Sequence, residues 1–202
     1  MKLYYSPGAC SLAPHIVLRE TGMPFSLERV DTSTHLTAHG VDYYTINRKG
    51  QVPLLEIESA ERLSEGSVIA QYIADKANNT DLLPTAGSMA RYRVMEWQNY
   101  VSAELHKSFT PLFNSAVNAD AKGVIADNLK KKYRWVSAQL EGRQFLTGET
   151  FTVADAYLFA VTGWAGHVGL DLSDLRELQQ FMERVAARPA VKEAMRAEGI
   201  SK

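Results

Sequence analysis

The fold is set by the stretch Lys2-Leu-Tyr-Tyr-Ser-Pro-Gly-Ala-Cys10-Ser-Leu-Ala-Pro-His-Ile-Val-Leu-Arg-Glu20. It opens with an apolar, aromatic run, Leu3–Tyr5, which is typical of a strand, and Pro7-Gly8 then indicates a turn. Beyond the turn, apolar residues recur at helical spacing, at Leu12, Ile16 and Val17. The sequence therefore predicts a strand, a tight turn and a helix, with Cys10 in the first turn of that helix.

The predicted position of Cys10 favours a reactive thiol. Unpaired backbone N–H groups and the positive end of the helix dipole stabilise an anion at a helix start, and a thiol ionises more easily there. The hydroxyl groups of Tyr5 and Ser11 are close enough in sequence to donate hydrogen bonds to a bound sulfur. The alternative is that Cys10 is a small buried apolar residue, as most free cysteines are.

Composition and charge are those of an ordinary globular protein. Of 202 residues, 46% are hydrophobic and 22% are charged, and the formal net charge is -1, so we expect neither nucleic acid nor a membrane surface as a partner. The single cysteine excludes an intramolecular disulfide and a Cys-x-x-Cys pair, which favours a reducing, cytoplasmic location. We expect no signal peptide and no membrane span, because no apolar run approaches ~18 residues.

Residues 1–79 combine strand and helix patterns in the order β-α-β and then β-β-α, which is typical of a small α/β layer fold. Further strands are predicted at 25–30, 52–57 and 62–64, and residues 31–50 are expected to form a loop with a short helix. A second helix is predicted from Ser64-Glu65-Gly66 on. Its apolar stripe is expected to consist of Val68, Ile69, Tyr72 and Ile73.

Residues 80–87 are expected to be a linker, because turn residues dominate there, and residues 88–202 to form an all-helical domain. Helices are predicted at 88–115, 120–142, 153–168 and 174–197, the first with Ser88 as its N-cap. Thr152 and Asp155 have the spacing of a capping pair, and an apolar run follows them. Asp155 is therefore interpreted as a buried capping carboxylate rather than a catalyst.

Three further motifs carry groups suited to a ligand, and each has a simpler interpretation. Gln51-Val52-Pro53 places a proline at a strand start, where base rates favour a trans bond. The N–H groups and carboxylate of Ser64-Glu65-Gly66 would suit the α-carboxylate and α-amine of an amino acid, although an ordinary helix cap also explains them. Asn99 and His106 share a face of one predicted helix and Glu104 is rotated away from it, which fits a cleft and a subunit interface together, or a solvated surface.

Together, these motifs resemble bacterial glutathione S-transferases of the beta class over essentially the whole chain. The matching segments are Met1-Lys-Leu-Tyr-Tyr-Ser-Pro-Gly-Ala-Cys-Ser11, Gly50-Gln-Val-Pro53, Leu63-Ser-Glu-Gly66, Glu104-Leu-His-Lys107 and Phe151-Thr-Val-Ala-Asp-Ala-Tyr157. The resemblance implies a thioredoxin-like α+β domain at 1–79 that binds glutathione, and an all-α domain at 88–202 with an apolar-substrate site. It also implies a homodimer.

The resemblance further implies roles for individual residues. Glutathione would lie beside Cys10, with its cysteinyl amide paired to the Val52 backbone ahead of a cis Pro53. Glu65 and Gly66 would hold its γ-glutamyl end, which Asn99 and Glu104 would reach from the partner subunit. The expected catalytic residues are Cys10, Ser11 and His106, and the expected glutathione-binding residues are Tyr5, Ala9, His35, Gln51, Val52, Pro53, Glu65, Gly66, Asn99, Ala103, Glu104 and Lys107.

Two positions depart from the family pattern. His35 stands where related chains usually carry Lys, at the glycine carboxylate of glutathione. A largely neutral imidazole would bind that carboxylate more weakly at pH 7 than an ammonium group does. Ala103 stands where a close relative has a Ser that assists binding. Both departures are expected to weaken glutathione binding without changing the fold.

The expected activity is conjugation of reduced glutathione to apolar electrophiles, a detoxification reaction with glutathione as co-substrate and with no cofactor or metal. Leu112, Phe113 and Trp164 are candidates for the apolar wall. A second expected route runs through Cys10, which would form a mixed disulfide with glutathione in thiol–disulfide exchange. The alternatives are a non-catalytic carrier of glutathione or apolar ligands, and a protein-interaction module on the same fold.

Overall fold

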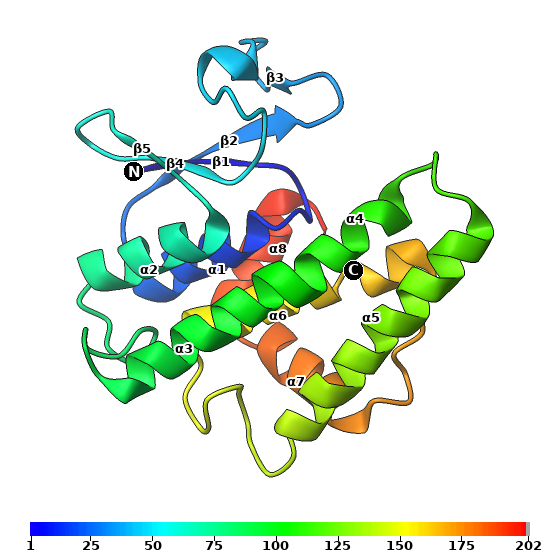
Figure 1. Ribbon diagram of the computed structural model, residues 1–202. Coiled ribbons are helices and arrows are strands. Elements are labelled where there is room, and N and C mark those ends of the chain that lie inside the picture. Colours follow the sequence, from blue (N-terminus) through cyan, green and yellow to red (C-terminus); the bar gives the residue numbers. More distant parts are fainter. Residues whose placement is uncertain (201–202) are drawn as a thin grey trace.

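A computed structural model describes residues 1–200 of the chain (Figure 1). Its five-stranded sheet has the order β3-β2-β1-β4-β5. β1 pairs parallel with β2, and the other pairs are antiparallel. The strands are β1 (Lys2–Tyr5), β2 (Ser26–Asp31), β3 (Leu36–Thr37), β4 (Leu54–Glu56) and β5 (Arg62–Ser64). This mixed sheet confirms the thioredoxin-like α+β architecture predicted for the N-terminal part.

Helices α1 (Leu12–Thr21) and α2 (Gly66–Lys76) lie along one face of the sheet (Figure 1). Both predicted helices are confirmed. The apolar stripe predicted for α2 is partly wrong, because Val68 is 47% exposed. The buried residues are Ile69, Ala70, Ile73 and Ala74. The small alanines belong to the buried stripe because α2 packs closely against both α1 and α6 (Val153–Thr162).

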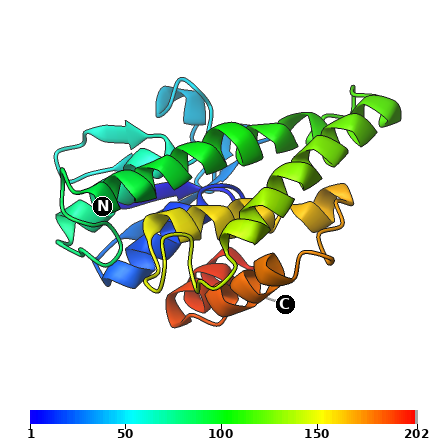
Figure 2. The same ribbon diagram turned by 60° about the horizontal axis from the view of Figure 1, so that its bottom comes forward.

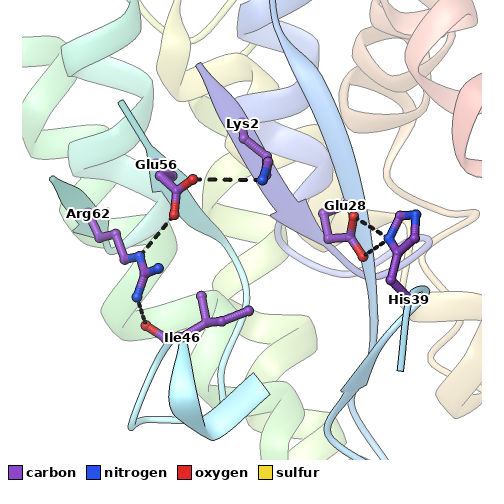
Figure 3. A network of polar contacts seen from close by, with 6 residues as sticks. All are labelled: Lys2, Glu28, His39, Ile46, Glu56 and Arg62. Atoms are coloured by element: carbon purple, nitrogen blue, oxygen red, sulfur yellow. Dashed lines mark hydrogen bonds and ion pairs between the residues drawn. The ribbon is translucent and has the colours of Figure 1, made fainter. Parts of the chain in front are cut away.

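The opposite face of the sheet is covered by the segment between β3 and β4, which includes the short helix η1 (Tyr43–Thr45). Tyr43 is fully buried in a separate apolar cluster on that face. Figure 3 shows how Arg62 fastens the segment: its Nε lies 3.0 Å from a Glu56 carboxylate oxygen and its Nη1 2.8 Å from the Ile46 carbonyl oxygen. The chain that leaves this anchored segment, toward β4, forms one wall of the cleft described below.

The rest of the described chain is helical, as predicted. After α2 come α3 (Met89–Tyr100), the π-helical segment η2 (Val101–His106), α4 (Lys107–Phe113), α5 (Ala119–Gln139), α6, the 3-10 turn η3 (Ala165–Val168), α7 (Arg176–Ala186) and α8 (Pro189–Glu198). Figure 2 shows α6 in the middle of the molecule, where it packs against α1, α2 and α3. One continuous core therefore joins the sheet-bearing part to the helical part.

Three of the predicted helices are wrong in extent. The helix predicted at 88–115 becomes π-helical at Val101 and ends at Phe113, and the α-helix predicted at 153–168 ends at Thr162. The helix predicted at 174–197 is two helices, α7 and α8. They separate because Pro189, the first residue of α8, disfavours helical backbone at the residue before it, and Arg188 is extended with ψ 136°.

The N-terminus of α6 confirms the predicted capping role of Asp155. Every residue of α6 is buried. The Asp155 carboxylate accepts the backbone N–H groups of Thr152 and Leu146, each at 2.8 Å. Burial raises the pKa of Asp155 to about 6. Asp155 therefore ties the loop before α6 to the start of that helix, and it does not line the cleft described below.

Candidate functional site

A cleft of about 420 Å³ lies where the wall leading to β4 and the start of α2 face η2 and α4. Polar and charged side chains line it from both sides. The structure brings together these predicted site residues: Cys10, His35, Gln51, Val52, Pro53, Glu65, Gly66, His106 and Lys107. They come from five separate parts of the sequence, and the fold places them around one opening.

Cys10 lies in the turn between β1 and α1. The helix begins two residues later, at Leu12, so the prediction that Cys10 belongs to its first turn is displaced. The Cys10 thiol donates to the Val52 carbonyl oxygen at 3.4 Å. Burial raises the pKa of Cys10 to about 11, and the backbone N–H groups of Cys10 and Ser11 offset this only in part. The predicted easy ionisation of Cys10 is therefore wrong for the ligand-free chain, because desolvation outweighs the N–H groups.

The turn before Cys10 is held by the far end of the chain. Glu198, the last residue of α8, accepts the Gly8 N–H at 2.9 Å, and its other carboxylate oxygen lies 2.8 Å from His15 Nδ1. The side chains of His15 and Glu198 are both fully buried. The Trp164 indole N–H donates to the Gly8 carbonyl oxygen at 2.7 Å. The position of Cys10 thus depends on contacts with the helical part.

The two residues whose hydroxyl groups were predicted to face a bound sulfur, Tyr5 and Ser11, do not line the cleft. The buried Ser11 hydroxyl donates to the Ser6 carbonyl oxygen and accepts the Ser6 N–H, both at 3.2 Å. Tyr5 is part of the core and does not line the cleft. These expectations for Tyr5 and Ser11 are wrong in the ligand-free chain because one hydroxyl closes the turn and the other ring packs inward. The Ser11 backbone N–H still hydrogen-bonds to the Cys10 sulfur and lowers the pKa of that thiol.

The segment before β4 offers a peptide backbone to the cleft. The Val52–Pro53 bond is cis, which confirms the expectation from the family resemblance. The Gln51 carbonyl oxygen is fixed from behind, where it accepts the Tyr43 hydroxyl at 3.0 Å and the Asn47 side-chain amide at 2.7 Å. The Val52 backbone is therefore held in place on the cleft wall next to Cys10.

The start of α2 supplies an acidic group. Glu65 precedes the helix with φ 73°, a conformation that side chains rarely adopt. Its carboxylate lies 2.8 Å from Lys49 Nζ, which also contacts the Ser64 hydroxyl at 3.1 Å. This contact lowers the pKa of Glu65. Gly66 lies over Pro53, whose Cγ would be 3.5 Å from a Cβ at position 66.

His35 lies on the same wall, with a nitrogen that has no partner. Its ring packs on Tyr44 with centroids 4.5 Å apart, and its backbone has φ 56°. His35 Nδ1 is buried without a hydrogen-bond partner among the described residues. Gly50 permits this packing, because a Cβ there would lie 2.6 Å from Tyr44 Cε1 and 3.0 Å from His35 Nδ1. The side chain at position 35 thus lies in the cleft as predicted.

The helical wall is centred on His106, the last residue of η2. His106 Nδ1 lies 2.7 Å from the Tyr157 hydroxyl, and the His106 ring contacts Trp164 with centroids 4.9 Å apart. Burial lowers the pKa of His106 to about 4, helped by the charge on Lys107. Burial also raises the pKa of Tyr157. Both groups are therefore neutral at pH 7.

Several predicted residues lie outside this cleft. The Glu104 carboxylate pairs with Lys132 at 2.8 Å on the outer surface, and Asn99 and Ala103 are exposed there too. Glu104 and His106 are two residues apart and so lie on nearly opposite faces of the helix, which lets His106 line the cleft while Glu104 lies on the outer surface. The predicted residues that do not line the cleft of one chain are Tyr5, Ala9, Ser11, Asn99, Ala103 and Glu104.

Sequence reasoning missed part of the lining. Lys49 lies next to the quoted Gly50 motif, and Tyr157 ends the quoted Phe151–Tyr157 segment, so both carried a signal. Ser64 also lies within the quoted Leu63–Gly66 segment, whereas the rest come from loops and helices where nothing in the pattern marks them. The missed residues are Thr32, Asn47, Lys49, Ser64, Ser102, Thr110 and Tyr157.

Residues 1–200 carry neither a cluster of metal-binding side chains nor a membrane-spanning helix. This part of the chain has no group of three or more His, Cys, Asp and Glu side chains arranged to hold a metal ion. Nor does it contain a helix with the length and apolar character needed to cross a membrane.

Family models match most of the chain. Residues 8–76 match the glutathione S-transferase N-terminal domain, and residues 100–189 match the glutathione S-transferase C-terminal domain. The two matches cover the elements that build both walls of the cleft.

Individual relatives are similar over the full length. The chain is 45% identical to glutathione S-transferase GstA of Escherichia coli O157:H7, over 99% of this chain and 100% of that one. A sphingomonad glutathione S-transferase complexed with glutathione is 42% identical with a TM-score of 0.95, over 100% of both chains. A beta-class glutathione S-transferase of Sphingomonas chungbukensis is 41% identical with a TM-score of 0.95, again over 100% of both chains.

Proposed function

This chain belongs to the glutathione S-transferase family, in its bacterial beta class, and we propose that its cleft binds glutathione beside Cys10 for transfer to an apolar electrophile. The observation that carries the proposal is the fixed Val52 backbone next to the Cys10 thiol, inside a cleft with Glu65 at one end and His106 opposite. As a glutathione transferase, the chain is an enzyme rather than a carrier or an interaction module.

The polar groups of the cleft match the parts of glutathione in order. The Val52 N–H and carbonyl pair with the cysteinyl amide of the tripeptide, as an added strand would. Glu65 and the N–H groups at the start of α2 receive the γ-glutamyl amine and carboxylate. Lys49 must then move from Glu65 or share it with the ligand, since the two are in contact at 2.8 Å. His35 and Gln51 lie toward the glycine end.

Conjugation uses the glutathione sulfur as the nucleophile. The backbone N–H groups of Cys10 and Ser11 and the His106 imidazole stabilise the thiolate. The thiolate forms a carbon–sulfur bond with the electrophile, and the leaving group departs with the electron pair of the bond that breaks. Phe113 and Trp164, whose ring centroids are 6.0 Å apart, provide apolar surface beside His106 for that substrate.

A second reaction runs through Cys10 itself. The Cys10 thiolate attacks a glutathione-containing disulfide, which forms a mixed disulfide with Cys10 and releases the other thiol. A glutathione thiolate then attacks the mixed disulfide, restores Cys10 and leaves as oxidised glutathione. Because burial raises the pKa of Cys10, this route starts from a thiol that must first lose its proton, and it is slow until a ligand changes the surroundings of the sulfur.

The enzyme works as a homodimer, and the exposed face of α3 supports this. Met89 is 66% exposed, Tyr92 53% and Met95 37% on that helix, and monomeric surfaces seldom gather large apolar side chains in this way. Asn99 and Glu104 continue the same exposed side and would reach the partner's γ-glutamyl site. Sedimentation of the full chain tests this, and a monomer at micromolar concentration would contradict it.

Two broader assignments complete the proposal. Residues 1–79 carry the glutathione site, residues 80–87 link the parts, and residues 88–202 carry the apolar-substrate site. The enzyme works in the cytoplasm, where a single free cysteine stays reduced and reduced glutathione is abundant.

Titration calorimetry with reduced glutathione, followed by conjugation to an activated aryl halide, tests the proposed function. We expect one site per chain and turnover that requires glutathione. Tight binding without turnover would instead indicate a carrier. Absence of binding would contradict the assignment of this cleft. The Val52 backbone cannot be mutated, so Glu65→Gln serves as the site variant, and Glu58→Gln, an exposed residue beyond β4, is the matched control.

A further inference from the structure

The contact between His106 and Tyr157 restricts where the imidazole proton can be. His106 Nδ1 and the Tyr157 oxygen are 2.7 Å apart, and the two rings meet edge to face with centroids 5.9 Å apart and planes at 88°. Tyr157 is only 6% exposed. One proton must lie between the two atoms. Either Tyr157 donates to an unprotonated Nδ1, or His106 donates from Nδ1 and keeps Nε2 unprotonated.

The surroundings of Tyr157 decide between these two arrangements. Among the described residues, the Tyr157 hydroxyl has a hydrogen bond to His106 Nδ1 alone, so a Tyr157 that accepted a proton from Nδ1 would leave its own buried hydroxyl proton without an acceptor. The proton of Tyr157 is therefore directed to His106 Nδ1. The neutral imidazole carries its own proton on Nε2 in this arrangement.

The other nitrogen of His106 is the one that reaches the cleft. His106 lines the cleft together with Cys10 and Tyr157. Among the described residues, Nε2 has no hydrogen-bond partner, and it is not one of the buried unpartnered atoms. Nε2 is therefore open to the cavity, while Nδ1 is used by Tyr157.

We propose that Tyr157 is a positioning residue that fixes His106 as the Nε2–H tautomer, so that a neutral imidazole donates a hydrogen bond to a substrate sulfur beside Cys10. This inference rests on the proposed function, in which that sulfur is a thiolate. A neutral donor stabilises an anion without being acidic enough to protonate it at pH 7. The opposite tautomer would turn a nitrogen lone pair toward the thiolate and repel it.

Nuclear magnetic resonance of the ligand-free chain tests the tautomer directly. With histidine labelled with nitrogen-15, two-bond proton–nitrogen spectra distinguish a protonated Nε2 from a protonated Nδ1. We expect His106 to show a protonated Nε2 and an unprotonated Nδ1 at pH 7. A protonated Nδ1 would overturn the proposal. This measurement does not depend on turnover, so it separates a failure of this inference from a failure of the proposed function.

A double-mutant cycle tests whether Tyr157 acts through His106. Tyr157→Phe keeps the buried ring, and it should lower kcat/KM about tenfold, a fraction of the ~100-fold that loss of a whole donor costs. In the His106→Ala chain, the same substitution should change kcat/KM by less than about twofold, because the residue on which Tyr157 acts is gone. Equal losses in the two backgrounds would overturn the proposal, because they would mean a purely structural role.

Tyr133→Phe is the matched control for both measurements. Tyr133 is fully buried in the helical part, and its hydroxyl accepts a hydrogen bond from Thr162 at 3.3 Å. It lies outside the cleft lining. The control should leave kcat/KM and the His106 spectrum unchanged. A loss of activity in Tyr133→Phe as large as that in Tyr157→Phe would overturn the specific role of Tyr157, since any buried tyrosine hydroxyl would then serve.

Discussion

Cys10 should remain a protonated thiol at neutral pH in the ligand-free chain, and alkylation with iodoacetamide measures this. Burial raises its pKa from the ordinary 9.0 to about 11. Two units correspond to about 100-fold less thiolate at pH 7. Because only the thiolate reacts, the alkylation rate should rise about tenfold per pH unit between pH 7 and 10 without levelling off.

The chain provides its own control for this measurement. It has a single cysteine, so alkylation reports on Cys10 alone. In the urea-unfolded chain the same thiol is free of burial, and its rate should level off above its ordinary pKa of 9.0. A folded chain whose rate levels off below pH 9 would refute the reasoning. That result would mean that the N–H groups of Cys10 and Ser11 outweigh the cost of burying the sulfur.

Cys10→Ala then separates the two proposed reactions. Conjugation uses the glutathione sulfur, so kcat/KM with an activated aryl halide should fall by less than about tenfold, the order expected for a weak donor. Reduction of a glutathione-containing disulfide needs the Cys10 sulfur and should fall to the uncatalysed rate. Both assays use the same preparation of the variant. Unchanged disulfide reduction would remove Cys10 from the chemistry.

Three further predictions follow from buried or cleft-facing groups. The proton resonances of the His106 ring should titrate near pH 4 rather than 6.5, and a titration midpoint above pH 6 would contradict the burial of the ring. Because the unfolded chain binds a proton at His106 at higher pH than the folded chain does, this group should lower the stability of the fold as pH falls from 6.5 toward 4. Glu198→Ala leaves the buried His15 and the Gly8 N–H without their partner and should lower the free energy of unfolding in urea by about 3 kcal/mol. The exposed Glu193→Ala should change it by less than about 0.5 kcal/mol, and equal effects of the two substitutions would refute the role of burial. His35→Lys should lower the Kd for glutathione about fivefold by adding a cation to the cleft. The control His39→Lys, at an exposed residue paired with Glu28, should leave that Kd unchanged. An unchanged Kd in His35→Lys would mean that the glycine carboxylate of glutathione binds elsewhere.

The elements of the N-terminal part were predictable because their signals are local. The Lys2–Glu20 stretch carries its strand, turn and helix in neighbouring residues, and the structure agrees with it to within two residues. The split between α7 and α8 was also present in the sequence, at Pro189, but the apolar periodicity on both sides concealed it. The π-helical turn at Val101–His106 left no comparable signal, because it arises from how that stretch packs rather than from a special residue.

The sequence predicted which residues form the site better than it predicted their protonation states. The resemblance placed Cys10, Val52 and Glu65 together, and the structure does so as well. The pKa of Cys10 was not predictable, because its burial depends on parts of the chain that are far away in sequence, including the contacts of Trp164 and Glu198 with the turn at Gly8. Local rules supply the N–H groups at a helix start, but only the tertiary fold fixes the desolvation that opposes them.

The raised pKa of Cys10 suits conjugation better than an ionised thiol would. In the ligand-free chain the thiol donates to the Val52 carbonyl oxygen at 3.4 Å. A bound tripeptide whose cysteinyl N–H pairs with that same oxygen would release the thiol proton from it. A neutral thiol is then free to donate to the glutathione sulfur, whereas a Cys10 thiolate would repel it. The N–H groups of Cys10 and Ser11 then stabilise the charge of the glutathione sulfur, so one structural feature explains both the inert free cysteine and the binding of an anionic ligand.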